Sequence, residues 1–145
     1  SRVPRRARAG GAVSEGGDGA AAPAGWIRGA LEDAFRALTE GRPTEAGALC
    51  RRVLAAAPEL AEAHFLVGLI ALELDDRRTA VAAFGTVTRL RPAHGAAWAQ
   101  LAWLHARAGR TAAADRALAE AVRHPGASPA VADLIGRTCT LQGRH

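Results

Sequence analysis

The sequence repeats itself at a fixed offset of 34 residues. Three stretches align when the chain is written in rows of that length, beginning at residues 37, 71 and 105. Each stretch contains the end of one run of helix-favouring residues, a short turn and the start of a second run. Pro58 and Pro92 are also 34 residues apart. A unit this short cannot bury its apolar face alone, so we expect successive copies to stack on one another.

Each repeat contains two amphipathic runs at helical spacing. In the middle repeat the first run carries the apolar residues Val67, Leu69, Ile70, Leu72 and Leu74. The second run places Ala80, Ala83, Phe84, Val87 and Thr88 on one stripe. A Gly or Asp that can adopt the left-handed conformation separates the two runs, and Pro92 ends the second because proline cannot continue the helical hydrogen bonds. The pattern predicts a helix hairpin in every repeat.

At this period, the small and large residues of the pattern resemble those of tetratricopeptide repeat (TPR) proteins. One repeat supplies Trp98, Leu101, Ala102, His105, Ala114, Leu118 and Ala121 at the family's positions. The repeat before it supplies His64, Val67, Gly68, Ala71, Ala80, Phe84, Val87 and Pro92. The resemblance implies an all-α fold, a right-handed α-solenoid of antiparallel helix hairpins with about seven helices.

The chain divides into a leader and an array. Residues 1–25 are rich in Arg, Gly, Ala and Pro and hold too little apolar surface to offset the entropy of ordering, so we expect them to be disordered. Residues 26–145 form the array, with units at 27–60, 61–94 and 95–128 and a partial unit at 129–145. The last residues stop where a further helix is due, so we expect a fragment of a longer protein.

Charge and hydropathy favour a soluble chain that binds no nucleic acid. All 19 basic residues are arginine, and the net charge is +5. We attribute the arginines to a GC-rich bacterial coding sequence, because they are mixed with acids and gather only at Arg2, Arg5, Arg6 and Arg8. No apolar run is long enough to cross a membrane, and the first 25 residues lack the apolar stretch of a secretory signal. We therefore expect a cytoplasmic protein without membrane contact.

The resemblance implies a binding groove lined by the first helix of each unit. Mapped onto this chain, the groove residues are Leu31, Phe35, Phe65, Leu66, Leu69, Gln100, Trp103 and Arg107. Their apolar side chains suit a helix or an extended peptide. The alternative for each residue is that it only packs between neighbouring helices. Trp103 is the strongest candidate, since tryptophan is enriched among residues that dominate binding energy.

No catalytic, cofactor or metal motif accompanies the repeat. The five histidines form no HxxxH or HExxH pair, and Cys50 and Cys139 lack metal-ligand spacing, so both cysteines are expected to be small buried side chains. We expect Asp75 and Asp76 in a turn, and Glu32 and Asp33 near the start of a helix. A negative charge there interacts favourably with the positive end of the helix dipole. We therefore predict no catalytic residue, no cofactor and no metal.

Two functions remain open for a chain of this kind. The favoured one is a non-catalytic scaffold that binds a protein or peptide ligand, or a neighbouring domain, in its groove. The alternative is the non-catalytic N-terminal arm of a larger enzyme, because arginine- and alanine-rich arrays of this style are similar to those that precede sulfotransferase or glycosyltransferase domains. Any chemistry would then lie in a domain downstream of His145.

Overall fold

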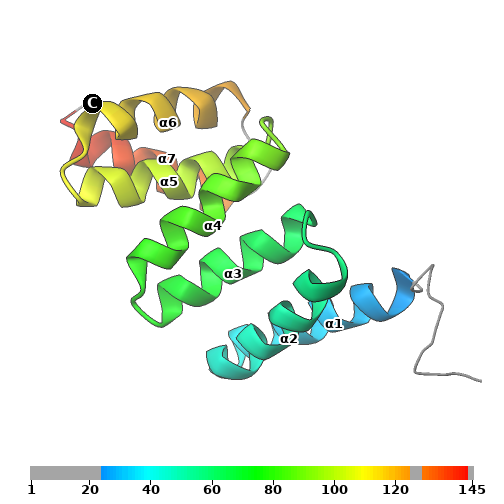
Figure 1. Ribbon diagram of the computed structural model, residues 1–145. Coiled ribbons are helices and arrows are strands. Elements are labelled where there is room, and N and C mark those ends of the chain that lie inside the picture. Colours follow the sequence, from blue (N-terminus) through cyan, green and yellow to red (C-terminus); the bar gives the residue numbers. More distant parts are fainter. Residues whose placement is uncertain (1–23, 125–128, 144–145) are drawn as a thin grey trace, which may run out of the picture. The chain divides into compact units, whose positions relative to one another are not determined.

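Helices account for all the regular secondary structure in the part of the chain that the computed structural model describes, residues 24–124 and 129–143 (Figure 1). The helices are α1 (Ala24–Thr39), α2 (Pro43–Ala56), α3 (Ala61–Glu73), α4 (Arg77–Leu90), α5 (Gly95–Arg107), α6 (Thr111–Arg123) and α7 (Pro129–Leu141). The predicted all-α class and the predicted number of helices are confirmed.

Helix α1 begins earlier than the sequence indicates. Ala24 and Gly25 belong to its first turn, although composition assigns both to the leader. Composition locates helix ends only to within a few residues, so a shift of this size is expected. The rest of the predicted disordered leader, residues 1–23, lies outside the described residues.

The chain forms two compact units, which join at Pro58 and Glu59. In the first unit α1 packs against α2, and most of the buried side chains of the two helices are small, among them Ala34, Ala46, Cys50 and Val53. Alanine, cysteine and valine let the two helices approach closely.

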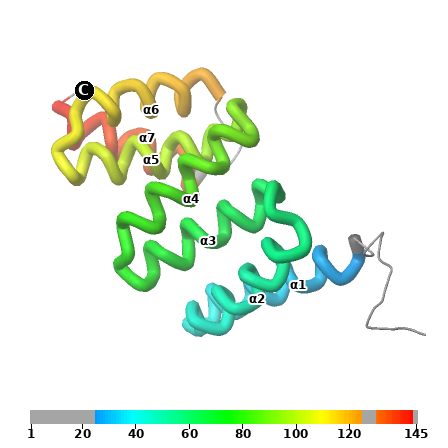
Figure 2. Tube along the Cα trace, viewed as in Figure 1, coloured from blue at the N-terminus to red at the C-terminus, as the bar shows by residue number. Residues whose placement is uncertain are grey.

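The second unit contains two hairpins and a fifth helix. Helix α3 packs on α4 and α5 packs on α6, while α4 contacts α5 and links the hairpins (Figure 2). Helix α7 then returns alongside α5 and also contacts α6. Phe84 is the largest fully buried side chain here, and alanines from several helices surround it in the core cluster. The second unit therefore packs its helices closely around the Phe84 ring.

The predicted stripe of the second helix is confirmed. The buried residues of α4 are Ala80, Ala83, Phe84, Val87 and Thr88.

The first helix of this repeat, α3, differs from the sequence pattern at its C-terminal end. Spacing groups Leu74 with the apolar residues of α3, but Leu74 is the C-cap residue and 53% exposed. The helix ends one residue earlier, which turns Leu74 away from the packed face.

The turns inside the hairpins share one conformation at the repeat period. Gly41, Asp75, Gly109 and Gly143 all have φ between 59° and 80°, the left-handed region. In the first three, the N–H of the next residue donates to the carbonyl five residues back at 2.8–2.9 Å, and the left-handed residue's own N–H donates three residues back at 3.1–3.2 Å. This is the Schellman motif, which satisfies the last carbonyls of a helix. The predicted left-handed turn is confirmed.

Helix starts vary from one repeat to the next. Asp76 caps α4 by accepting a hydrogen bond at Oδ1 from the Thr79 N–H at 3.2 Å, and its Oδ2 accepts one from the Thr79 hydroxyl at 2.7 Å. His94 caps α5 through Nδ1, which accepts from the Ala97 N–H at 3.1 Å. Arg42 precedes α2 and cannot accept, but Pro43 at the first helical position has no N–H to satisfy.

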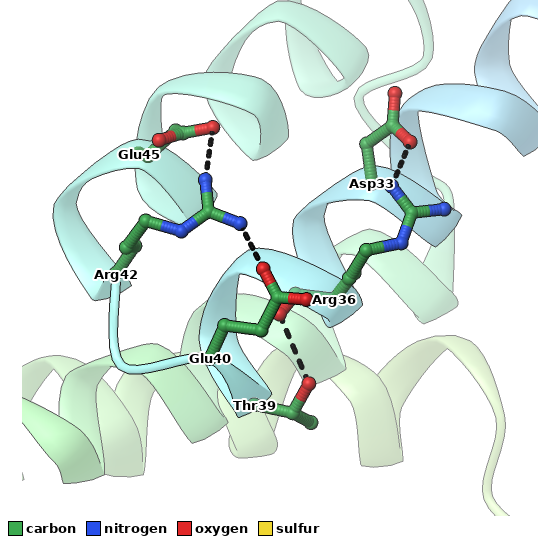
Figure 3. Close-up of polar contacts among 6 residues, drawn as sticks. All are labelled: Asp33, Arg36, Thr39, Glu40, Arg42 and Glu45. Carbon is green, nitrogen blue, oxygen red and sulfur yellow. Dashed lines mark hydrogen bonds and ion pairs between the residues drawn. The ribbon is translucent and has the colours of Figure 1, made fainter.

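One expectation about charges is wrong. The sequence predicts Asp33 near a helix start, but α1 begins at Ala24, so Asp33 lies in the middle of the helix. There it pairs with Arg36 one turn later, at 2.9 Å (Figure 3). Both side chains are exposed, so this ion pair contributes little to stability.

Candidate functional site

Three of the predicted groove residues form a line along one side of α5. Gln100, Trp103 and Arg107 follow one another at spacings of three and four residues, which places them on the same helix face. Gln100 and Trp103 are half-buried and Arg107 is exposed. We call these three residues the α5 face.

Arg107 partly covers the tryptophan ring. Its guanidinium carbon lies 5.5 Å from the centroid of the Trp103 ring, within the range of a cation–π contact. The pair presents an aromatic surface with a positive charge at its edge. Such a surface suits an apolar or aromatic side chain of a ligand, which can contact the exposed part of the indole.

The three candidates on α3 are more deeply involved in packing. Leu66 is only 8% exposed, and Leu69 is half-buried against the core cluster. The ring of Phe65 makes an edge contact with Phe84, with centroids 5.3 Å apart, and lies 5.0 Å from the His94 ring. These side chains hold α3 in place and leave only part of their surface for a ligand.

On α1 the two candidates differ sharply. Leu31 is buried, whereas Phe35 one turn later is 53% exposed. Phe35, Leu69 and Trp103 occupy the same position in successive repeats, since each follows the previous one by the repeat period. A large apolar residue therefore recurs at one register position of the first helices, and it is most exposed in the first repeat.

Sequence reasoning missed a pocket in the second unit. It lies between the start of α4, the end of α5 and the turn before α6, and has a volume of about 280 Å³. Its lining residues are Arg77, Arg78, Val81, Leu104, Ala108 and Arg110. The available signal was the recurrence of arginine at the start of a second helix. Arg77 and Arg78 begin α4, and Arg110 precedes α6.

Two of the histidines, His94 and His105, act as hydrogen-bond acceptors within the fold. Burial lowers the pKa of His94, and Arg91 nearby lowers it further, although a backbone hydrogen bond acts in the opposite direction. Burial, Arg110 and Arg116 lower the pKa of His105, whose Nδ1 accepts a hydrogen bond from Arg110 Nε at 2.9 Å. Both imidazoles are thus held neutral as hydrogen-bond acceptors.

Side chains that can bind metal ions do not cluster in the described part of the chain. Residues 24–124 and 129–143 contain no group of three or more His, Cys, Asp or Glu side chains that could hold a metal ion. Both cysteines are free thiols, with Cys50 buried and Cys139 half-buried against the core. Within the same residues, no helix has the length and apolar character that crossing a membrane requires.

Comparison with known proteins identifies the fold. The sequence matches no protein-family model and none of the curated proteins. Among solved structures, a chain of the CopN-Scc3 complex is similar with a TM-score of 0.70 and 13% identity, over 91% of this chain and 82% of that chain. MamA is similar with a TM-score of 0.68 and 17% identity, over 84% of this chain and 71% of that chain. The chain therefore has a TPR-like helical repeat fold.

Proposed function

We propose that this chain is a protein-interaction scaffold that binds a peptide segment of a partner against the α5 face. The observation that carries the proposal is the Trp103–Arg107 pair, an incompletely buried tryptophan with a guanidinium 5.5 Å from its ring centre. Tryptophan and arginine are the residue types that most often dominate binding energy. Neither side chain belongs to the core cluster around Phe84.

The fold supports this proposal in general terms. One similar structure is a complex of two named proteins, so a fold of this type is compatible with holding a protein partner. We further propose that the ligand is a helix or an extended peptide and that it contacts Leu69 on α3 as well as the α5 face. The absence of nucleic-acid and membrane binding and a cytoplasmic location stay predictions.

The narrower alternative is an arm of a sulfotransferase-like or glycosyltransferase-like enzyme. Its support is the arginine- and alanine-rich composition of the repeats, and neither similar structure is named as a transferase. The sequence of the gene downstream of His145 would test it. A phosphate-binding loop on an α/β pattern would favour the enzyme arm, and further helical repeats would favour the scaffold.

The scaffold proposal can be tested by selecting peptides from a displayed random library against the purified chain. We expect selected peptides to bind at least tenfold more weakly to Trp103→Ala than to the unaltered protein, because a hot-spot residue contributes about 2 kcal/mol or more. Val122→Ala is the matched control, since Val122 is a 56% exposed apolar residue on α6. Selected peptides that bind Trp103→Ala as tightly as the unaltered protein would overturn the α5 face as the binding site.

Fluorescence gives an independent measurement of the same contact. The chain has three tryptophans, so the double variant Trp26→Phe, Trp98→Phe leaves Trp103 as its sole emitter. A peptide that covers the indole should shift the emission to shorter wavelength, because it removes water from the ring.

The circular dichroism spectrum of Trp103→Ala should match that of the unaltered chain. Lost helicity would instead show that Trp103 is needed for folding.

A further inference from the structure

The pocket of the second unit combines an apolar floor with a positively charged rim. Val81, the buried Leu104 and the Ala108 methyl group supply the floor. Arg77, Arg78 and Arg110 supply the rim. The six lining residues include no carboxylate, so the pocket concentrates positive charge beside an apolar surface.

In the part of the chain that the structure describes, the carboxylates near these arginines are exposed, so they neutralise the charge only weakly. Hydrogen bonds from Thr79, and to a smaller extent the charge of Arg78, lower the pKa of the exposed Asp76, which makes Asp76 a neighbouring negative charge for Arg78. Arg77 is 3.9 Å from Asp75, at the outer limit of an ion pair, and the Asp75 side chain is 86% exposed. Arg110 donates from Nε to the Nδ1 of His105, a neutral acceptor. The hydrogen bond of Arg110 therefore leaves its charge uncompensated by a carboxylate.

The first repeat shows what an arginine at this turn does when carboxylates are present. Arg42 holds the position of Arg110, two repeat periods earlier, and it pairs with Glu45 at 2.7 Å and with Glu40 on its other side (Figure 3). These two carboxylates raise the pKa of Arg42. Two repeat periods after Glu40 and Glu45 the chain has Ala108 and Ala113. The position thus holds arginine in the first and third repeats, and the third repeat has alanine at the positions of both acidic partners.

The start of α4 is an unfavourable place for two arginines. Arg77 and Arg78 are the first two residues of α4, and Arg110 is the N-cap residue of α6 without a side-chain capping bond. The N-terminus of a helix carries partial positive charge and favours acids. Arg77 and Arg78 therefore do not stabilise the start of α4, and a ligand of opposite charge gives a physical reason for the cluster.

We propose that this pocket binds an acidic peptide segment of a protein partner, separately from the α5 face. Carboxylates of the peptide contact Arg78 and Arg110 in the way that Glu40 and Glu45 contact Arg42, and one apolar side chain of the peptide rests on Val81 and Leu104. The pocket is slightly smaller than the roughly 300–1,000 Å³ of small-molecule sites, which suits one side chain and its neighbours better than a cofactor.

The test uses a fluorescently labelled peptide, Glu-Asp-Leu-Glu-Glu-Leu-Asp, and the full chain in an anisotropy titration. Its control is the amide version, Gln-Asn-Leu-Gln-Gln-Leu-Asn. We expect the amide version to bind at least tenfold more weakly, because charge-assisted hydrogen bonds are roughly twice as strong as neutral ones. Binding of the acidic peptide should also weaken as salt screens the exposed charges.

Variants locate the site. Arg78→Ala and Arg110→Ala should each weaken binding of the acidic peptide by about tenfold, which is the size of one charge-assisted contact. Arg89→Ala is the matched control, since Arg89 is an exposed arginine near the other end of α4. The thermal midpoint should stay equal or rise in Arg78→Ala, because the charge opposes the helix dipole.

Three outcomes would overturn the proposal. If Arg89→Ala weakened binding of the acidic peptide as much as Arg78→Ala, the peptide would be responding only to the net charge of the protein. Equal binding of the amide version would exclude a role for the rim arginines. Full competition by inorganic phosphate or by a single-stranded oligonucleotide would mean that the pocket takes any anion. Trp103→Ala should leave binding of the acidic peptide unchanged, which separates failure here from failure of the proposed function.

Discussion

The ring of Phe84 fills the space that a side chain at Gly68 would need. A Cβ built on Gly68 would lie 2.5 Å from Cε1 and 2.6 Å from Cζ of Phe84. Phe84 is fully buried in the core cluster, so its ring can shift only by displacing closely packed neighbours. Glycine at this position is what allows α3 and α4 to pack around an aromatic residue.

Gly68→Ala should therefore destabilise the protein, even though alanine favours helices. Overpacking of this kind costs about 1–3 kcal/mol, more than the gain of up to about 1 kcal/mol in helix propensity. Urea denaturation followed by circular dichroism measures the difference. Gly85→Ala is the control, because Gly85 lies within α4 and a Cβ at this position would meet nothing within 4 Å. It should raise stability, and equal effects of the two variants would contradict the steric argument.

Asp75→Gly should stabilise the protein. Asp75 is the only non-glycine residue with positive φ in the described part of the chain, at 59°, whereas glycine holds the matching turn positions. The left-handed conformation costs an L-residue about 1 kcal/mol, and glycine avoids this cost. We expect a gain of about 0.5–1 kcal/mol in the free energy of unfolding. Gly109→Ala makes the reverse change and should destabilise by about 1 kcal/mol; a loss in both variants would refute this account.

Stability should fall on mild acidification because of His94. Its Nδ1 accepts the Ala97 N–H that caps α5, and its pKa is lowered from the ordinary value of 6.5 chiefly by burial. The unfolded chain then binds a proton more readily than the folded chain between pH 6.5 and the lower folded pKa. The contribution of His94 is thus complete above about pH 6.5 and is lost as pH falls towards the folded pKa.

His94→Asn tests this pH dependence. Asparagine is a good N-cap that does not titrate, so the variant should remain stable at neutral pH and lose less stability than the unaltered chain on acidification. The measurement is the urea midpoint as a function of pH. His105, whose pKa is also lowered, contributes in the same direction, so some pH dependence should persist. An unchanged slope in His94→Asn would show that the cap does not titrate.

The Cys50 thiol should resist alkylation in the native protein. Burial raises its pKa to about 11, although Arg51 acts against the rise, and the side chain has no exposed surface. Near pH 8 roughly one thiol in a thousand is then ionised, and the thiolate is the reactive form. In the variant Cys139→Ala, iodoacetamide should label Cys50 only after denaturant is added. Rapid labelling without denaturant would mean that α1 and α2 open readily.

The sequence predicted the elements of this fold because the decisive interactions there are local. A left-handed turn needs only a residue such as Gly41 or Gly109 and the preceding helical carbonyls, which lie within the same few residues. The buried stripe of α4 followed from helical spacing alone. The α5 face, by contrast, came from a family resemblance, and it stays a proposal.

Other features required the tertiary structure because they depend on residues that are distant in the sequence. The family resemblance implied one groove that contains Phe65, Leu66 and Trp103. In the structure, contacts with neighbouring helices bury Leu66, pack Phe65 against Phe84 and leave Trp103 partly exposed. The pocket is a further case, because its arginines at 77–78 and 110 meet only when α4 packs against α5. The sequence alone determined the repeat, its helices and its turns through local hydrogen bonding and periodicity. Packing between helices decided which side chains remain available to a partner, because burial depends on what the neighbouring helix supplies.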